Sequence, residues 1–239
     1  MSESREVSVV TGAGRGIGKA IALRLAREGH NVAIFSRTEK ELRQVQEMIE
    51  LTGVGCKYYT GDVADENFVN SSIQNVLECF NKVDCLINNA GIGIFKNLVD
   101  SSLDEFKRQI DTNLIGAYLF SKAVLPSMIK RRSGSVINIS SLAGKNSMAG
   151  GTMYSSTKHA LLGLTRSLML EVRQYNIRVA SICPGSVESE FARDSGSDPR
   201  STSGILMPED VAEAVVSVLK MPVRALISEL DLRPTNPKK

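Results

Sequence analysis

The stretch Val9-Val10-Thr11-Gly12-Ala13-Gly14-Arg15-Gly16-Ile17-Gly18 joins a short apolar segment to an amphipathic one. It does not fit G-x-G-x-x-G, because the third glycine would fall on Ile17, and it fits T-G-x-x-x-G-x-G instead. Glycines let the backbone turn tightly and approach a pyrophosphate held by the exposed N–H groups of a helix N-terminus. The turn is therefore a candidate phosphate-binding site, made by Thr11, Gly12, Arg15, Gly16, Ile17 and Gly18.

Apolar, β-branched runs recur along the chain and alternate with segments of helical periodicity. This alternation predicts βαβ units, and hence an α/β fold with a parallel sheet covered by helices on both faces. The predicted strands are Val7–Thr11, Asn31–Ser36, Gly55–Thr60, Val83–Asn88, Gly134–Ile139, Ile177–Ile182 and Arg224–Leu230. The predicted helices lie near 17–28, 39–51, 66–80, 103–130, 154–175 and 208–220.

The chain shows no linker, repeat or break in composition, so we expect a single domain over residues 1–239. Residues 186–207 form the only long irregular stretch, which is rich in serine, glycine and proline. Irregular segments of that length in compact domains are usually functional or disordered. We expect residues 186–207 to form a lid over the substrate.

Composition excludes several classes of protein. With 239 residues, 42% hydrophobic and 23% charged, the chain is neither disordered nor collagen-like. A net charge of +3 is too small to indicate nucleic-acid binding. The polar start and the lack of a long apolar run predict a cytoplasmic protein without a membrane span. The scattered cysteines predict reduced thiols and no metal site; they are Cys56, Cys79, Cys85 and Cys183.

The end of the second predicted strand bears on the choice of dinucleotide. NAD sites usually carry an acid about 20 residues past the glycines, but no acid lies between Val32 and Thr38. Ser36-Arg37 stands there instead, and Arg37 and Arg15 could bind a 2′-phosphate through paired, charge-assisted hydrogen bonds. This favours NADP(H), the alternative being that both arginines are solvated surface groups.

Further motifs follow in order along the chain, and together they carry a resemblance from Val7 to about Phe191. They are Asp62-Val63, Asn88-Asn89-Ala90-Gly91, Asn113, Ser141, Tyr154-x-x-x-Lys158 and Pro184-Gly185. The sequence resembles the single-domain short-chain dehydrogenases/reductases. The resemblance implies a Rossmann-type, doubly wound, seven-stranded parallel sheet in the order 3-2-1-4-5-6-7.

Tyr154 and Lys158 stand four residues apart and so share one face of a helix. A free tyrosine has a pKa of about 10, and a nearby ammonium is expected to lower it toward the working range. The resemblance implies that Tyr154 is the general acid and base and that Lys158 also binds the nicotinamide ribose. It further implies that Ser141 holds the substrate oxygen and that Asn113 holds a water linking the lysine to solvent.

The remaining cofactor contacts are also implied by the resemblance. The Asp62 carboxylate would accept from the adenine amino group, with the Val63 backbone beside it. The segment from Asn88 to Gly91 would line the adenine-ribose side of the cleft, giving Asn89, Ala90 and Gly91 as contacts. The nicotinamide side would be met by Pro184, Gly185, Val187 and Ser189.

The expected activity is NADPH-dependent reduction of a ketone, an aldehyde or a 3-oxoacyl thioester, with no metal. The sequence is similar to 3-oxoacyl-[acyl-carrier-protein] reductases, whose carrier-docking arginines correspond to Arg132 and Tyr175, although the carboxyl terminus departs from theirs. The other reading is a catalytically silent sensor of NADP(H), which would have no use for a proton relay. The expected partners are a small-molecule substrate and further copies of the chain, as a homotetramer or homodimer.

Overall fold

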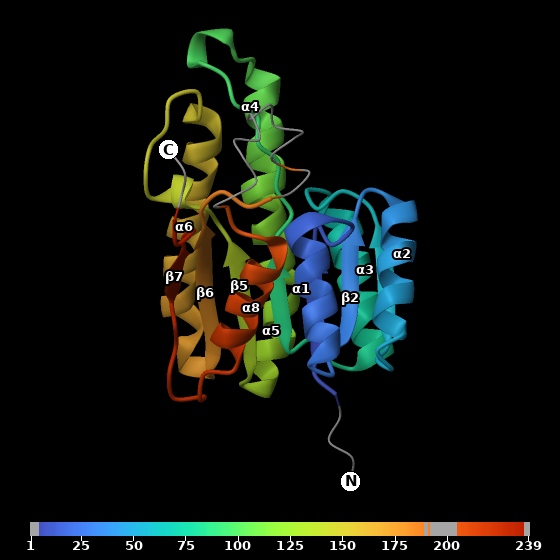
Figure 1. Ribbon diagram of the computed structural model, residues 1–239. Helices are drawn as coiled ribbons and strands as arrows, with labels where there is room; N and C mark the ends of the chain where they lie inside the picture. The colour runs from blue at the N-terminus through green and yellow to red at the C-terminus, as the bar shows by residue number, and fades with distance from the viewer. Residues whose placement is uncertain (1–4, 189–190, 192–204, 237–239) are drawn as a thin grey trace.

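The computed structural model describes residues 5–188, 191 and 205–236. Seven parallel strands form one sheet in the order β3-β2-β1-β4-β5-β6-β7, which confirms the predicted fold class (Figure 1). Strands β1, β2 and β4 are nearly all buried, as expected of strands covered on both faces, whereas the edge strand β3 is partly exposed. The strands are β1 Val7–Thr11, β2 Asn31–Ser36, β3 Cys56–Thr60, β4 Cys85–Asn88, β5 Gly134–Ile139, β6 Ile177–Pro184 and β7 Glu229–Leu232.

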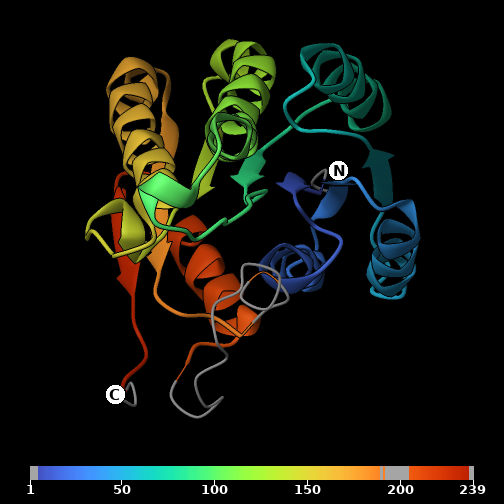
Figure 2. The same cartoon turned by 90° about the horizontal axis from the view of Figure 1, so that it is seen from above.

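Helices cover both faces of the sheet, as the view from above in Figure 2 shows. On one face, α1 Gly16–Arg27, α2 Glu39–Glu50 and α8 Pro208–Leu219 bury aliphatic side chains against the strands. On the other face lie α3 Glu66–Phe80, α5 Gly116–Arg131 and α6 Thr152–Val172. Burial of these apolar helix faces is the main driving force that holds the layers together.

The segment predicted as one helix over 103–130 is divided. It begins as α4 Leu103–Ile110, continues as a π-helical turn, η2 Asp111–Ile115, and ends as α5. A π-turn has no distinctive periodicity that a sequence pattern would reveal, and such turns often occur at functional sites. Shorter 3-10 turns precede α4 and follow β5 and α6; they are η1 Leu98–Asp100, η3 Leu142–Gly144 and η4 Arg173–Tyr175.

The last strand is displaced from its predicted position at Arg224–Leu230. The structure places β7 at Glu229–Leu232, paired with Ser181 to Pro184 of β6. The chain before it turns at Pro222, whose carbonyl accepts from the Ala225 N–H at 2.7 Å. Val223 and Arg224 therefore lie in a turn and are not available for the edge of the sheet.

Candidate functional site

A cavity of about 370 Å³ opens at the carboxyl ends of the central strands. It lies where the strand order reverses between β1 and β4, the place where open α/β sheets bind ligands. Residues after β1, β2, β3, β4 and β5 line it, together with Tyr154 and Lys158 of α6. The fold thus brings most of the predicted motifs to one cleft.

The glycine turn forms one wall of the cavity. Gly12 has a φ of +65°, and a Cβ on Gly18 would lie 2.2 Å from the Gly12 carbonyl oxygen, so neither position accepts a side chain without rearrangement. Helix α1 begins at Gly16, and its N-cap residue Arg15 makes no side-chain capping hydrogen bond. The first N–H groups of α1 are therefore free of a side-chain cap, in an arrangement suited to a phosphate.

Thr11 does not line the cavity, although the sequence assigned it to the cofactor site. It is 2% exposed, and its Oγ1 accepts from the N–H groups of Asn89 and Ala90, each at 3.0 Å. The Asn89 Nδ2 returns hydrogen bonds to the Thr11 carbonyl at 3.0 Å and the Gly12 carbonyl at 3.2 Å. Thr11 therefore acts as a brace that ties the glycine turn to the loop after β4.

The predicted 2′-phosphate end of the cavity contains both expected arginines. Arg15 and Arg37 are exposed and line it with Ser36. Glu41, in the first turn of α2, also lines this end, and a Cβ on Gly14 would lie 2.7 Å from its Oε2. Glu41 was not predicted from the sequence, because an acid of an NAD site is expected at the end of the second strand and Glu41 lies beyond it, in α2.

The cavity is also lined by Asp62 and Val63, which were predicted to meet the adenine, and by Asn89, Ala90 and Gly91, whose loop packs against the glycine turn. The Asp62 Oδ1 accepts from the Ala64 N–H at 2.9 Å, which orients the carboxylate at the end of β3. Asn88, which was also expected to line the cleft, does not. It is 4% exposed, and its Nδ2 donates to the Asn138 Oδ1 at 2.8 Å inside the protein.

Tyr154 and Lys158 meet at the inner end of the cavity. They are 8% and 4% exposed, and the Lys158 Nζ lies 5.7 Å from the centre of the Tyr154 ring. The ammonium donates to the Ile139 carbonyl at 3.0 Å, at the end of β5. Helix α6 thus presents both side chains to the same wall of the cleft, as their spacing predicted.

The pKa values of this pair differ from the expectation. Burial raises the pKa of Tyr154 to about 12, and a hydrogen bond with Ser141 only partly offsets this. Burial lowers the pKa of Lys158 to about 8, against a smaller opposing influence of Cys183. The expected lowering of the Tyr154 pKa by Lys158 is therefore absent, because desolvation dominates at both groups.

Ser140 and Ser141 take different positions at the end of β5. The Ser141 hydroxyl accepts from the Ala143 N–H at 3.1 Å and hydrogen-bonds with Tyr154. The Ser140 hydroxyl donates to the Lys158 carbonyl at 3.4 Å, which ties β5 to α6. Ser141 is therefore the serine beside the tyrosine, whereas Ser140 lines the cavity and ties the sheet to the helix.

Asn113 lies in the π-helical turn and is 2% exposed. Its Oδ1 accepts from the Ile92 N–H at 2.8 Å, and its Nδ2 donates to the Ile92 carbonyl at 2.9 Å and to the Thr157 Oγ1 at 3.0 Å. A Cβ on Gly91 would lie 3.2 Å from the Asn113 Oδ1 and 3.7 Å from the Lys158 Nζ. Asn113 therefore lies next to the lysine without lining the cavity itself.

Of the described residues after β6, residues 185–188 lie outside the cavity wall, whereas Phe191 lines it. The Gly185 N–H donates to the Leu232 carbonyl at 2.8 Å, and Val187 bridges to Leu206. Pro184 ends β6 and pairs with Leu232. Ser189 and most of the expected lid over 186–207 lie outside the described residues.

Two further features concern other classes of function. Within the described ranges, no helix is long and apolar enough to cross a membrane. The same ranges contain no group of three or more His, Cys, Asp or Glu side chains placed to hold a metal ion. The cysteines are unpaired; Cys79 is exposed and the other three are buried.

The family model described as "short chain dehydrogenase" matches residues 6–200. An uncharacterised oxidoreductase of Staphylococcus aureus strain USA300 is 34% identical over 229 residues, which is 96% of this chain and 97% of the relative. An alcohol dehydrogenase from the archaeon Thermococcus sibiricus, complexed with 5-hydroxy-NADP, is 35% identical with a TM-score of 0.89, covering 98% of this chain and 100% of that one.

A metagenomic short-chain oxidoreductase in complex with NADP is 34% identical, with a TM-score of 0.86 over 99% of this chain and 100% of that one. The likeness thus extends over nearly the whole chain in sequence and in structure. It includes the glycine turn and the tyrosine–lysine pair, which lie within the residues that the family model matches. The chain belongs to the short-chain dehydrogenase family of oxidoreductases.

Proposed function

We propose that the protein reduces a ketone or aldehyde to an alcohol with NADPH, and that Tyr154 is the general acid. The observation that carries this proposal is the placement of Tyr154 and Lys158 at the inner end of a cleft whose outer end holds Arg37. One end suits a carbonyl and the other an anionic group, and the glycine turn lies between them.

The residues of the cleft fit a dinucleotide. Gly12 and Gly18 pack so closely against each other and against the loop after β4 that a side chain at either position would distort the glycine turn, whose shape lets the backbone approach a pyrophosphate. Arg37 and Arg15 would hold a 2′-phosphate, and the Asp62 carboxylate would accept from an adenine amino group. The structural relatives that carry NADP or 5-hydroxy-NADP support the same cofactor here.

NADPH, when bound, supplies the hydride that the carbonyl carbon accepts. The chain must then deliver a proton to the carbonyl oxygen and hold that oxygen in place. A Tyr154 pKa of about 12 keeps the phenol protonated at neutral pH, which is the form required for donation. The neighbouring Ser141 hydroxyl can hydrogen-bond to the same oxygen and position it for the transfer.

Lys158 supports the proton donor after the transfer. Its pKa of about 8 leaves most of the ammonium charged at pH 7, so the Lys158 Nζ, 5.7 Å from the centre of the Tyr154 ring, holds a proton that can be returned to the tyrosine. Asn113 fixes the backbone of Ile92 and the Thr157 hydroxyl on either side of this region. We infer that Asn113 holds the Ile92 backbone and the Thr157 hydroxyl in place beside Lys158, so that a proton can return to the tyrosine.

The position of Arg132 argues against a carrier-protein thioester as the substrate. Arg132 ends α5 and precedes β5, so it lies at the amino edge of the sheet, opposite the cleft of the same chain. Its guanidinium donates to the Gln174 carbonyl at 2.8 Å and lies 5.8 Å from the Tyr175 ring centre. A free ketone or aldehyde needs no contact at that edge.

The test measures NADPH oxidation with a panel of diketones, acetoacetyl thioesters and quinones. We expect turnover by the wild type and a loss of several orders of magnitude in Tyr154→Phe, with the Kd for NADPH nearly unchanged. A Tyr154→Phe variant that keeps a tenth of the rate would contradict the assigned role. Tight NADPH binding without turnover on any carbonyl would favour the silent sensor instead.

A further inference from the structure

Two phenylalanine rings enclose the ring of Tyr154. Phe95 packs edge-on, with ring centres 5.1 Å apart and planes inclined at 61°. Phe191, which lines the cavity, lies 5.9 Å from the Tyr154 ring at 48°. The space beside the proposed proton donor is therefore bounded by aromatic faces and edges.

Gly93 allows these rings to come so close. A Cβ at this position would lie 2.6 Å from the Phe191 Cζ and 2.9 Å from the Phe95 Cε2. Contacts that short do not occur, so any side chain at Gly93 would displace one or both rings. The backbone of Gly93 thus forms a surface on which both phenylalanines rest.

Two buried amides hold the irregular segment that carries Phe95. Gln109, which is 0% exposed, accepts from the Ile94 N–H at 3.1 Å and donates to the Ile94 carbonyl at 3.5 Å. Asn113, four residues on, makes the equivalent pair of bonds to Ile92. The Lys96 N–H donates to the Gly150 carbonyl at 2.8 Å, so the segment is fixed on both sides of Phe95.

Charge is unevenly distributed along the cleft. Apart from Tyr154 and Lys158, its ionisable lining residues Arg15, Arg37, Glu41 and Asp62 all follow the first three strands in the sequence. The described lining also includes the apolar side chains of Ile92, Ile139 and Phe191. The Lys158 ammonium already donates to the Ile139 carbonyl, and neither it nor these apolar side chains would offer a counter-ion to a cationic substrate.

Given the proposed reductase function, we infer that the substrate carries its carbonyl directly on a flat apolar ring, as aryl ketones and aryl diketones do. Phe95 and Phe191 determine this specificity by ring-to-ring contact with the aryl group. Aromatic contacts prefer offset or edge-on packing, and each can change relative affinity about twofold to tenfold beyond simple burial. Gln109 is a positioning residue that keeps Phe95 in place.

The test compares kcat/KM for 1-phenylpropane-1,2-dione and a straight-chain 2,3-dione, with NADPH. We expect the wild type to prefer the aryl compound by about tenfold or more, and Phe95→Leu to lower that preference about threefold to tenfold. Phe80→Leu is the matched control, because Phe80 ends helix α3 away from the cavity. It should leave the ratio unchanged.

A binding measurement separates this inference from the proposed function. Saturation-transfer NMR with the NADP-loaded protein and 1-phenylethanol should detect contact with the ring, weakened in Phe95→Leu and retained in Phe80→Leu. Equal kcat/KM values for the two diones, or a ratio of these values that is unaltered in Phe95→Leu, would contradict the aromatic specificity and leave the proposed reductase function in place. If no carbonyl is turned over, the proposed reductase function is wrong. If the wild type also shows no NMR contact with the ring of 1-phenylethanol, the proposed aromatic site is wrong as well.

Discussion

Tyr154 and Lys158 are ionisable side chains that the fold buries almost completely. Burial is the largest cause of both pKa shifts, upward for the tyrosine and downward for the lysine. Burial therefore favours the neutral form of each group. The neutral form of Tyr154 is also the proton donor, so burial favours the form that the proposed reaction needs. Burial of a charged Lys158, in contrast, lowers the stability of the fold.

Replacing Lys158 should therefore stabilise the protein while impairing activity. The folded pKa of about 8 lies below the ordinary 10.5, so the unfolded chain binds more protons between these values and stability rises with pH across that interval. Lys158→Met removes this dependence. After allowing for the lost hydrogen bond to Ile139, the free energy of unfolding should increase by about 1–3 kcal/mol near pH 7.

The check is urea unfolding of wild type and Lys158→Met at about pH 7 and about pH 9.5. The advantage of the variant should shrink by about 2 kcal/mol at the higher pH. A variant that is less stable than the wild type at both pH values would mean that Lys158 is a net stabilising group. Turnover should fall in the variant under either condition.

Arg37 should decide between the two nicotinamide dinucleotides. In Arg37→Asp, a 2′-phosphate would lose a charge-assisted partner and gain a repulsive one, so NADPH affinity should fall about tenfold to a hundredfold. NADH has no 2′-phosphate, so its affinity should change little. Titration of both dinucleotides measures this, with Arg27→Asp, an exposed arginine at the far end of α1, as control. Equal losses for NADPH and NADH would remove the assigned role from Arg37.

At the scale of elements, buried amides and hydroxyls connect the sheet to α5 and α6. The Asn88 Nδ2 donates to the Asn138 Oδ1 at 2.8 Å and to the Ser121 Oγ at 3.1 Å. The Asn138 Nδ2 donates to the Thr165 Oγ1 at 2.7 Å. These bonds join β4, β5 and both helices beneath the cleft. They therefore fix the position and rotation of α6 relative to the sheet, and α6 carries Tyr154.

Asn138→Ala should be strongly destabilising, because it leaves buried partners on Asn88 and Thr165 without their hydrogen bonds. The expected loss in the free energy of unfolding is about 2–4 kcal/mol, from unsatisfied polar groups and a small cavity. Denaturant unfolding measures it. Asn67→Ala, at an exposed position in the first turn of α3, should change stability by less than about 0.5 kcal/mol. Similar values for the two variants would show that the network contributes little.

The elements show where sequence reasoning succeeds and where it stops. Buried β-branched runs and helical periodicity suffice for β1, α1 and most other elements, because those signals are local. The π-turn around Asn113 and the shortened β7 depend on what packs against them. In the site, the spacing of Tyr154 and Lys158 is local to one helix, whereas the roles of Glu41 and Gln109 arise only when distant segments meet.

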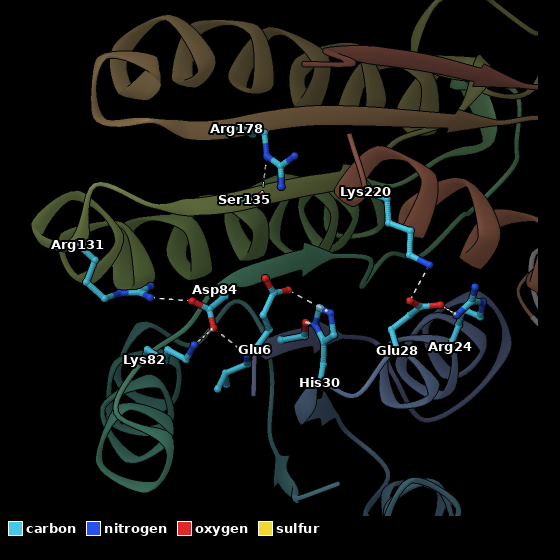
Figure 3. Close-up of polar contacts among 12 residues, drawn as sticks. Glu6, Arg24, Glu28, His30, Lys82, Asp84, Arg131, Ser135, Arg178 and Lys220 are labelled. Atoms are coloured by element: carbon cyan, nitrogen blue, oxygen red, sulfur yellow. Dashed lines mark hydrogen bonds and ion pairs between the residues drawn. The ribbon is translucent and has the colours of Figure 1, made fainter. Parts of the chain in front are cut away.

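At the scale of the whole molecule, the two edges of the sheet differ in character. The carboxyl edge holds the cleft, with ionisable groups buried at its inner end. The amino edge holds ion pairs and polar contacts, as Figure 3 shows for the residues around His30 and Asp84. Ion pairs also occur at the carboxyl edge, where Lys145 pairs with Glu229, so the cleft is distinguished by the buried pair Tyr154 and Lys158.

The outer faces of α5 and α6 lead us to predict a homodimer or homotetramer. Phe120 and Val124 of α5 are fully buried in the core, but Tyr118 is 45% exposed, and Leu170 of α6 is 56% exposed. Apolar side chains on neighbouring helices suit a two-fold interface, where each contributes twice. Light scattering at micromolar concentration should give a multiple of the 25.9 kDa chain mass. A species of monomer mass would refute the prediction.

The amino edge should set the response of the fold to acid. Burial lowers the pKa of His30 below 6.5, although Glu6, Asp84 and Glu28 oppose this and Lys82 adds to it. At Asp84, burial raises the pKa, but hydrogen bonds from Arg131, Lys82 and the Val7 N–H outweigh it and leave the pKa below 3.8. Both groups therefore bind protons more readily in the unfolded chain.

Stability should accordingly fall in two separate pH intervals. The His30 contribution is complete above pH 6.5 and is lost as the pH falls from there to the folded pKa, whereas the Asp84 contribution is lost only below about pH 3.8. Urea unfolding from about pH 8 to pH 5 isolates the first interval. His30→Asn should flatten the curve there, and His159→Asn, an exposed position, should not. If the wild type and His30→Asn lose stability in parallel, the buried imidazole is not the group that responds.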